Sequence, residues 1–186
     1  MVLILASASP RRAELLRNAG IAFTAQATDV PERRRNGESP KRFAVRLARE
    51  KARAIRARKP RSLVLGADTI VVVRGKVLGK PRDRRDARRM LRLLSGRSHQ
   101  VTTAVCLAGP GFEDARSETT RVFLRKLGEK EIRDYVASGE PMDKAGAYAV
   151  QGSASRFVSR IEGCYFNVVG LPVPLVYRML RAHDCL

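Results

Sequence analysis

The sequence predicts an α/β protein in which helices flank a central mixed β-sheet. Short apolar runs rich in β-branched residues alternate with segments that open on Ser-Pro and close on glycine, which are common boundary residues of helices. The 186 residues are 44% hydrophobic, enough to build a buried core. This length favours a single domain over residues 1–186, made of two lobes that share one core.

The first part of the chain is predicted to run strand, helix, strand, helix. Residues 2–6 are a short apolar run typical of a buried strand. Ser9 and Pro10 then provide an N-cap and a first helical residue, and Gly20 is a good residue to end that helix. The next expected elements are a strand over residues 21–27 and a long helix that opens at Ser39-Pro40 and is bounded by Pro60.

A central strand is predicted for the apolar, β-branched run over residues 63–73, which carries Asp68 in its middle. Turn residues and capping residues divide the rest of the chain into further elements. These are a short strand ended by Gly79-Lys80-Pro81, a helix capped by Asp83, a hairpin of residues 98–107 and 115–124, a helix over 129–138, a strand over 157–161 and a last helix from Leu171-Pro172.

The chain is strongly basic, with 37 Lys and Arg against 18 Asp and Glu and a net charge of +19. Such a charge is one mark of nucleic-acid binding. Aromatic residues do not interleave with the arginines, however, as platforms for stacked bases would. We therefore favour a solvated, arginine-biased surface over a nucleic-acid interface, and a polyanionic small-molecule substrate fits either interpretation.

Composition also bears on location and on metal chemistry. No apolar stretch approaches the roughly 20 residues needed to cross a bilayer, and the first residues lack the basic start of a signal peptide, so a cytoplasmic protein is expected. The three cysteines form no CxxC motif, and there are only two histidines. Any metal is therefore expected to be a hard, oxygen-bound cation such as Mg²⁺ or Mn²⁺.

Residues 7–12 place two serines and two arginines at the start of the first predicted helix. Backbone N–H groups at a helix N-terminus, together with guanidinium groups, suit the oxygens of a phosphate chain. The GxxxxGK[ST] spacing of a P-loop is absent. An ordinary serine-capped helix with solvent-exposed arginines is the alternative.

Asp68 is the most unusual residue of the predicted central strand. A carboxylate inside an apolar strand is costly unless it is paired or binds a metal. Gly66, two residues earlier, is expected to let a ligand approach closely. Asp68 is therefore a candidate general base or metal ligand, and a structural aspartate at a strand bulge is the alternative.

Four further polar residues could serve a phosphate or a nucleobase. Lys51 and Lys80 could neutralise phosphate charge, although each taken singly is more typical of a solvated surface. Glu32 could provide a second carboxylate. Gln151 follows a glycine-containing loop, and its amide both donates and accepts, as reading a base edge requires. A turn of small residues is the alternative there.

Taken together, these motifs resemble the Maf family of nucleotide pyrophosphatases, also called septum-formation-inhibitor-like proteins. The resemblance covers nearly the whole chain and keeps the motifs in order. No single motif is specific to the family, but the whole set in this order along the chain is. The matching segments are residues 5–12, 49–52, 66–69, 78–81, 94–99, 143–148, 151–152 and 167–172.

The resemblance implies hydrolysis of a nucleoside triphosphate between its α- and β-phosphates, releasing a monophosphate and pyrophosphate. It implies a divalent metal, Mg²⁺ or Mn²⁺, and commonly a homodimer. It also implies an α/β fold with a cleft between two lobes, similar to that of the inosine-triphosphate pyrophosphatases. Housecleaning of the nucleotide pool and a link to division arrest are the biological roles that follow.

The resemblance also carries over site residues. Asp68 matches the family's proton acceptor and a metal ligand, and Glu32 matches an acidic position that assists metal binding. Three positions separate subgroups, and the residues here resemble the subgroup acting on dTTP and UTP, including 5-modified uridine triphosphates. Those three are Arg11, Thr69 and Gln151. The positions on the phosphate side of the substrate are matched by Ser7, Arg11, Arg12, Lys51 and Lys80.

Two alternatives stay open at this point. One is a pyrophosphatase of the same fold that acts on purine triphosphates, such as inosine or 7-methylguanosine triphosphate. The other is a non-enzymatic basic protein that binds nucleic acid or arrests division through a partner. The second alternative predicts binding that weakens steeply with salt and does not depend on Asp68.

Overall fold

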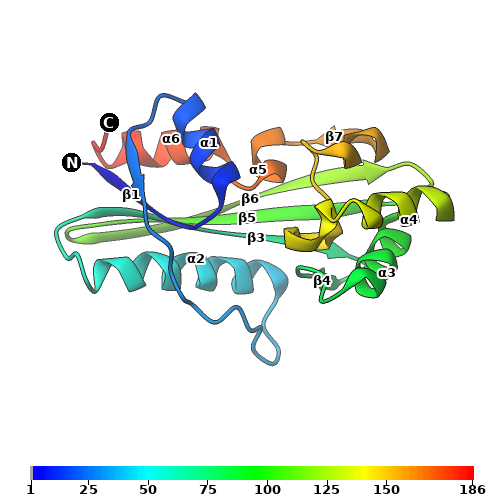
Figure 1. Ribbon diagram of the computed structural model, residues 1–186. Coiled ribbons are helices and arrows are strands. Elements are labelled where there is room, and N and C mark those ends of the chain that lie inside the picture. Colours follow the sequence, from blue (N-terminus) through cyan, green and yellow to red (C-terminus); the bar gives the residue numbers. More distant parts are fainter. Residues whose placement is uncertain (1) are drawn as a thin grey trace. The chain divides into compact units, whose positions relative to one another are not determined.

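The computed structural model describes residues 2–186, and the chain forms two compact units. The first unit contains the described residues up to Thr69 together with Thr103–Glu118 and Gly170–Leu186, and the second contains Ile70–Thr102 and Thr119–Val169. Strands β3, β5 and β6 contribute residues to both units (Figure 1). The strands are β1 (Leu3–Ala6), β2 (Phe23–Ala25), β3 (Leu63–Val73), β4 (Lys76–Leu78), β5 (Ser98–Gly109), β6 (Phe112–Leu124) and β7 (Val158–Glu162).

The first four helices fall between these strands along the chain and the last two follow β7, which makes the fold α/β as predicted. They are α1 (Pro10–Asn18), α2 (Pro40–Arg56), α3 (Arg84–Leu94), α4 (Glu129–Ala137), α5 (Tyr165–Val169) and α6 (Val173–Ala182), with three short 3₁₀ helices at Glu140–Asp143, Ala145–Ala147 and Ser153–Phe157. No helix among the described residues has both the length and the apolar character needed to span a bilayer.

Within residues 2–186, the seven strands are hydrogen-bonded in the order β2-β1-β3-β5-β6-β7, with β4 beside β3. β1 lies parallel to both β2 and β3, whereas β4 runs antiparallel to β3 and β7 antiparallel to β6. The sheet is therefore mixed, which confirms the predicted fold class. The cleft expected between two lobes stays a prediction.

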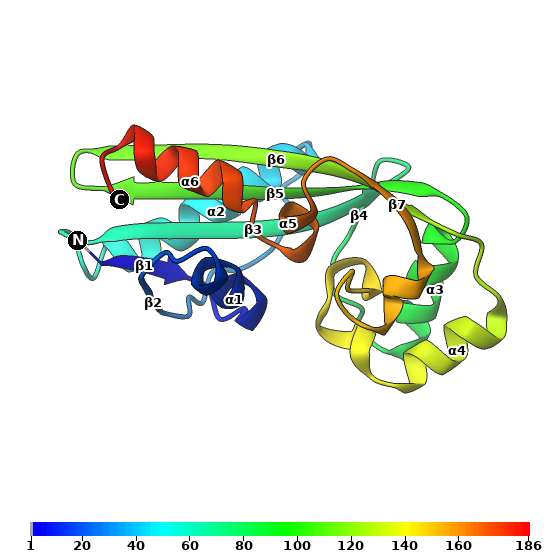
Figure 2. The ribbon, with the colours of Figure 1, turned by 90° about the horizontal axis from the view of Figure 1, so that it is seen from above.

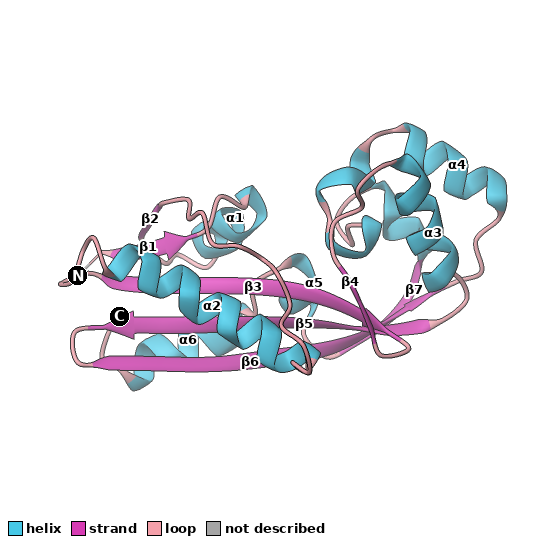
Figure 3. Ribbon diagram, turned by 90° about the horizontal axis from the view of Figure 1, so that it is seen from below, coloured by secondary structure: helices cyan, strands magenta, loops and turns pink. Residues whose placement is uncertain are grey.

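In the first unit, α2 covers one face of the strands and α1 and α6 cover the other (Figures 1 and 3). Seen from above, α1 lies beside β1 and β2, and α6 lies over β5 and β6 (Figure 2). Ser39 caps α2 by accepting a hydrogen bond from the Arg42 N–H, as its position before Pro40 predicts. Ser9 occupies the N-cap of α1, but its side chain makes no capping hydrogen bond.

The second unit has its own core, built where α3 and α4 pack with the outer parts of the long strands. Asp83 caps α3 by accepting from the Asp86 N–H, and Gly139 follows α4 with a φ of 78°. The hairpin strands run closer to their turn than predicted, because only residues 110–111 separate them. The core is formed by side chains that include Met90, Leu91, Leu94, Val122, Ile132, Tyr135 and Phe157.

Candidate active site

Asp68 lies in β3, the strand that packs against α2. The reason for Gly66 differs from the one expected from sequence. A Cβ on Gly66 would clash with the Ala48 carbonyl oxygen and lie 2.8 Å from the Ala52 nitrogen, both backbone atoms of α2. Gly66 therefore makes room for the helix, and the expectation that it admits a ligand is wrong.

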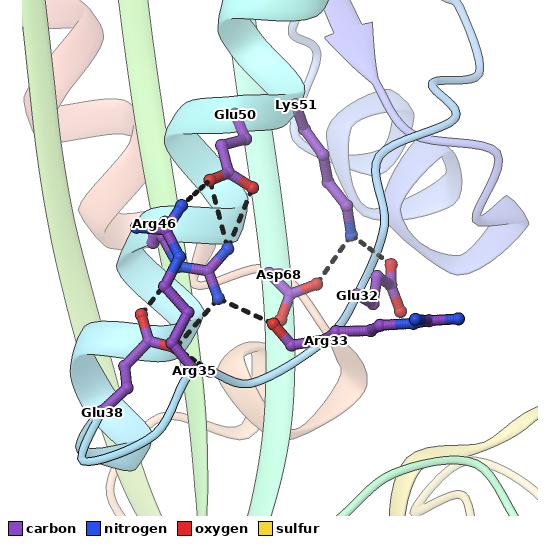
Figure 4. Close-up of polar contacts among 8 residues, drawn as sticks. All are labelled: Glu32, Arg33, Arg35, Glu38, Arg46, Glu50, Lys51 and Asp68. Carbon is purple, nitrogen blue, oxygen red and sulfur yellow. Dashed lines mark hydrogen bonds and ion pairs between the residues drawn. The ribbon is translucent and has the colours of Figure 1, made fainter.

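Close approach of α2 brings Lys51 to Asp68. The Lys51 Nζ lies 2.7 Å from Asp68 Oδ1 and 2.6 Å from Glu32 Oε1, so one ammonium group bridges two carboxylates (Figure 4). Lys51 is 7% and Asp68 5% exposed, whereas the Glu32 side chain is 54% exposed. The surface alternative for Lys51 is thus wrong, because the residue lies on the buried face of α2.

The electrostatics of this cluster are unusual. Burial raises the pKa of Asp68, and the nearby Lys51 and Arg12 charges oppose the shift. Burial also lowers the pKa of Arg12, against the attraction of Asp68 and Glu32. No described residue donates a hydrogen bond to Asp68 Oδ2, and that atom is not sealed from solvent. One carboxylate oxygen therefore stays open to a water or ligand.

Arg12 is buried, contrary to the alternative of a solvent-exposed arginine. Its Nη1 donates to Ser7 Oγ at 3.1 Å and to the Ala67 carbonyl at 3.0 Å, and its Nε donates to the Gly170 carbonyl at 2.8 Å. Its Nη2 donates to Thr69 Oγ1 at 3.0 Å. Arg12 therefore joins the turn before α1 to β3 and to the chain before α6.

Arg11 differs from Arg12 although the two are adjacent. Its side chain is half-exposed and makes no hydrogen bond or ion pair with the part of the chain that the structure describes. Thr69 is engaged instead, because its Oγ1 also lies 2.9 Å from Thr103 Oγ1. Ser7 Oγ accepts from the Ser9 N–H at 3.2 Å as well as from Arg12. Of these predicted residues, Arg11 has the free side chain.

Lys80 and Gln151 belong to the second unit. Both are exposed, and Lys80 follows β4 in a turn whose Gly79 carbonyl accepts from the Gly146 N–H at 3.0 Å. Gln151 lies in the turn before the 3₁₀ helix Ser153–Phe157. The glycine-containing loop and the lysine turn are therefore joined within this unit.

Glu140 holds the turn that carries Gln151. Its Oε2 accepts from the Ser153 N–H at 3.1 Å and from Ser153 Oγ at 2.5 Å, and its Oε1 accepts from the Tyr135 hydroxyl at 3.1 Å. A Cβ on Gly152 would clash with the same carboxylate. Gly152 is therefore needed for this close packing.

The acidic pair meets the simplest requirement for a hard divalent cation. The described residues contain no cluster of three or more His, Cys, Asp or Glu that could form a complete protein cage. Asp68 and Glu32 nevertheless converge on one cation, the Lys51 ammonium, and Asp68 Oδ2 has spare acceptor capacity. Mg²⁺ typically uses one or two carboxylates and takes its other ligands from water and substrate phosphates. The residues present therefore fit Mg²⁺ or Mn²⁺.

Comparison with known proteins shows to which family the chain belongs. A family model described as Maf-like protein matches residues 2–183. The chain belongs to the Maf family. A "dTTP/UTP pyrophosphatase" from Koribacter versatilis is 59% identical over 97% of this chain and 94% of its own length. Proteins of the same description from Syntrophomonas wolfei and Symbiobacterium thermophilum are 53% and 52% identical, over 95% and 96% of this chain and 94% and 92% of their own lengths.

The fold of this Maf-family chain also resembles a solved structure, that of the Staphylococcus aureus Ham1 protein. The TM-score is 0.54 at 14% sequence identity, and the match covers 98% of this chain and 100% of the other. This likeness concerns the fold alone. It agrees with the sheet and helix arrangement predicted from the sequence.

Sequence reasoning did not single out the residues that hold the segments carrying Glu32 and Gln151. These are Glu38 and Arg46, which contact the loop carrying Glu32, and Glu140 in the second unit. One signal was available: Arg46 and Glu50 are four residues apart on a helix, the spacing of an intrahelical ion pair.

Proposed function

We propose that this protein is a nucleoside triphosphate pyrophosphatase that hydrolyses dTTP and UTP, including 5-modified uridine triphosphates, to the monophosphate and pyrophosphate. Family membership and the names of relatives more than 50% identical over most of the chain support the proposal. The observation that carries it is the buried Asp68, paired with Lys51 through one oxygen and open at the other.

Asp68 is the proposed proton acceptor. A water hydrogen-bonded to Oδ2 transfers a proton to the carboxylate as its oxygen bonds to the α-phosphorus. The bond from that phosphorus to the bridging oxygen breaks, and pyrophosphate leaves with the electron pair. Burial raises the pKa of Asp68 toward the neutral range, where a general base is most effective.

Asp68 and Glu32 are the proposed ligands of Mg²⁺ or Mn²⁺. When bound, the metal supplies Lewis-acid stabilisation of charge on the phosphate oxygens. The Lys51 ammonium holds both carboxylates in place and adds a positive charge beside them. This charge favours binding of a triphosphate and stabilises the negative charge that develops on the leaving group.

The other phosphate-side residues divide into two kinds. Arg11 and Lys80 have exposed or half-exposed side chains that are available to bind phosphate oxygens. Arg12 and Ser7 are buried and mutually hydrogen-bonded, so their main contribution is to shape the turn before α1. Backbone N–H groups at the start of that helix add further donors.

Base selectivity is assigned to Arg11, Thr69 and Gln151. The Gln151 amide can donate to one atom of a pyrimidine edge and accept from another. Thr69 acts through its hydrogen bond from Arg12, which fixes the side chain at this position of β3. Homodimerisation and roles in nucleotide-pool housecleaning and division arrest remain predictions that follow from the family resemblance, and a cytoplasmic location remains a prediction from composition.

A substrate panel tests this function. The purified protein with Mg²⁺ or Mn²⁺ is offered dTTP, UTP, CTP, GTP, inosine triphosphate and 7-methylguanosine triphosphate in ¹⁸O-labelled water, with products resolved by mass spectrometry. We expect fastest turnover of dTTP and UTP, one ¹⁸O in the monophosphate and none in pyrophosphate, and no turnover after chelation of the metal.

Other results would favour the alternatives. Faster turnover of a purine triphosphate than of dTTP and UTP would show that purine triphosphates are the substrate class. Label in the pyrophosphate would place the attack at the β-phosphorus. No turnover of any nucleotide, together with salt-sensitive binding to DNA or RNA, would favour a non-enzymatic protein.

A further inference from the structure

The loop between β2 and α2 has no regular secondary structure, yet it carries Glu32. Glu32 reaches Lys51 although its own side chain is half-exposed, so its position depends on the path of the loop backbone. Residues 33–35 are three exposed arginines, whose mutual repulsion does not favour a fixed path. Contacts elsewhere must therefore hold the loop beside Lys51.

Arg46 supplies several of these contacts, beside an exposed ion pair of Arg35 with Glu50. Arg33 is the residue that follows Glu32 in the loop. Arg46 Nη2 donates to the backbone carbonyl of Arg33 at 2.9 Å (Figure 4). The same guanidinium donates to Glu38 through Nε at 2.7 Å and Nη2 at 2.9 Å. Its Nη1 donates to both oxygens of Glu50 at 3.1 Å. All five N–H groups of Arg46 are thereby used, on α2 and on the loop.

Glu38 extends the same network into the loop. Its Oε2 also accepts from the Arg35 N–H at 3.1 Å, and its carbonyl accepts from Arg34 Nε at 2.7 Å. The side-chain hydrogen bonds from Arg46 lower the pKa of Glu38 to about 2. The Glu38 and Arg46 side chains are 10% and 16% exposed, so solvent and salt weaken this ion pair less than an ordinary surface ion pair.

We propose that Arg46 is a positioning residue that fixes the loop backbone at Arg33 and thereby holds the Glu32 carboxylate against Lys51. This inference rests on the proposed function, in which Glu32 contributes to the active site. Arg46 contacts neither Lys51 nor Asp68 among the hydrogen bonds and ion pairs of the described residues, so it acts through the loop. The planar fork of arginine matters here, because a lysine ammonium cannot reach Arg33, Glu38 and Glu50 in the same geometry.

Two variants and a matched control test the proposal. Arg46→Met removes the charge and Arg46→Lys keeps it. Arg42→Met removes an exposed arginine one turn earlier on α2, whose side chain makes no hydrogen bond or ion pair with any described residue. Trypsin cleavage after residues 33–35 is followed by mass spectrometry under native conditions. We expect cleavage at least about fivefold faster in both Arg46 variants and within twofold of wild type in Arg42→Met. Unchanged cleavage in the Arg46 variants would overturn the proposal.

A double-mutant cycle tests whether Arg46 acts through Glu32. Arg46→Lys is expected to lower kcat/KM by about tenfold in the wild-type background, in the range found for supporting residues of a metal site. In a Glu32→Gln background the same change should cost less than about twofold, because the group that it positions is already lost. Equal losses in both backgrounds would show a general structural role and overturn the proposal.

The failures of the two proposals are distinguishable. If Asp68→Asn retains activity, the proposed function fails whatever the Arg46 variants do. If Asp68→Asn abolishes activity while Arg46→Lys is indistinguishable from wild type in both cleavage and kcat/KM, the function stands and the positioning role is wrong. Should Glu32→Gln be inactive, the trypsin result alone decides the matter.

Discussion

Two irregular segments carry proposed site residues, and they are held in different ways. The loop with Glu32 is held by the charged pair of Arg46 and Glu38. The turn with Gln151 is held by Glu140, whose carboxylate accepts from two neutral residues of the described chain, Ser153 and Tyr135. The difference continues in the interiors of the two units.

The first unit buries charged groups, namely Arg12, Lys51 and Asp68. Near the second segment the buried polar pair is neutral: His99 Nε2 lies 2.7 Å from the Tyr148 hydroxyl, and burial lowers the pKa of His99 to about 4. Buried charges are costly unless they are paired, and the second unit buries one of its own, Asp86, which pairs with Arg89. We therefore expect the phosphate chemistry of the proposed function mainly at the three buried charges of the first unit. The base recognition that we propose for Gln151 falls in the second unit.

The largest effect is expected from Lys51→Met, which leaves the buried Asp68 without its partner. Loss of one member of a buried ion pair costs about 3–5 kcal/mol, and we expect chemical denaturation to show a loss of this size together with at least a hundredfold loss of kcat/KM. Lys41→Met is the control, because Lys41 is exposed on the same helix and its side chain makes no hydrogen bond or ion pair with a described residue. Wild-type stability in Lys51→Met would contradict the buried pair.

Arg12→Met and Arg11→Met separate a buried arginine from its half-exposed neighbour. The Arg12 change removes the guanidinium that donates to the Ala67 and Gly170 carbonyls, and we expect a loss of roughly 3 kcal/mol of unfolding free energy. Arg11→Met should change stability by less than about 0.5 kcal/mol and raise KM for dTTP. Equal stability losses would remove the distinction that we draw between the two residues.

His99 gives the second unit a pH dependence of its own. Its pKa of about 4 in the folded protein lies below the ordinary value of 6.5, so the unfolded chain binds the extra proton between these pH values. Stability should therefore fall as the pH drops from 6.5 to about 4, by about 3 kcal/mol more in wild type than in His99→Gln. Denaturation curves at a series of pH values measure this, and parallel losses in the two proteins would count against it.

Glu140→Gln is expected to destabilise the protein less than Lys51→Met or Arg12→Met and to act on selectivity. The amide keeps one acceptor oxygen but turns the other position into a donor, which opposes the Ser153 N–H and hydroxyl. We expect a loss of about 1–2 kcal/mol and a severalfold change in the ratio of dTTP to GTP turnover. Glu129→Gln, at an exposed ion pair on α4, serves as control, and an equal shift of the ratio there would contradict a specific role of Glu140.

The sequence predicted most of the regular elements because their boundaries depend on local chemistry. Ser39 before Pro40 and Asp83 before Arg84 are capping arrangements that need no tertiary information. The helix α5 and the 3₁₀ helices were not predicted, since segments of three to five residues are too short for a periodic pattern. Tertiary contacts decide the conformation of such segments.

The site was predictable only in part. Lys51 continues the buried stripe of α2 after Ala44, Leu47 and Ala48, so its helical spacing indicated burial even though its residue type did not. The role of Gly66 depends on how closely α2 packs on β3, and the network of Arg46 joins residues up to 13 positions apart. Neither is visible in a local pattern, because both arise from packing between elements.

The most direct test of the account is turnover of dTTP by Asp68→Asn. The variant keeps the size of the side chain and removes its ability to accept a proton, so we expect kcat to fall by about 10²–10⁴-fold while the protein stays folded. Asp86→Asn, at a buried aspartate of the second unit that accepts from the Arg82 N–H and pairs with Arg89, should retain near wild-type kcat. Turnover by Asp68→Asn within tenfold of wild type would contradict the central claim.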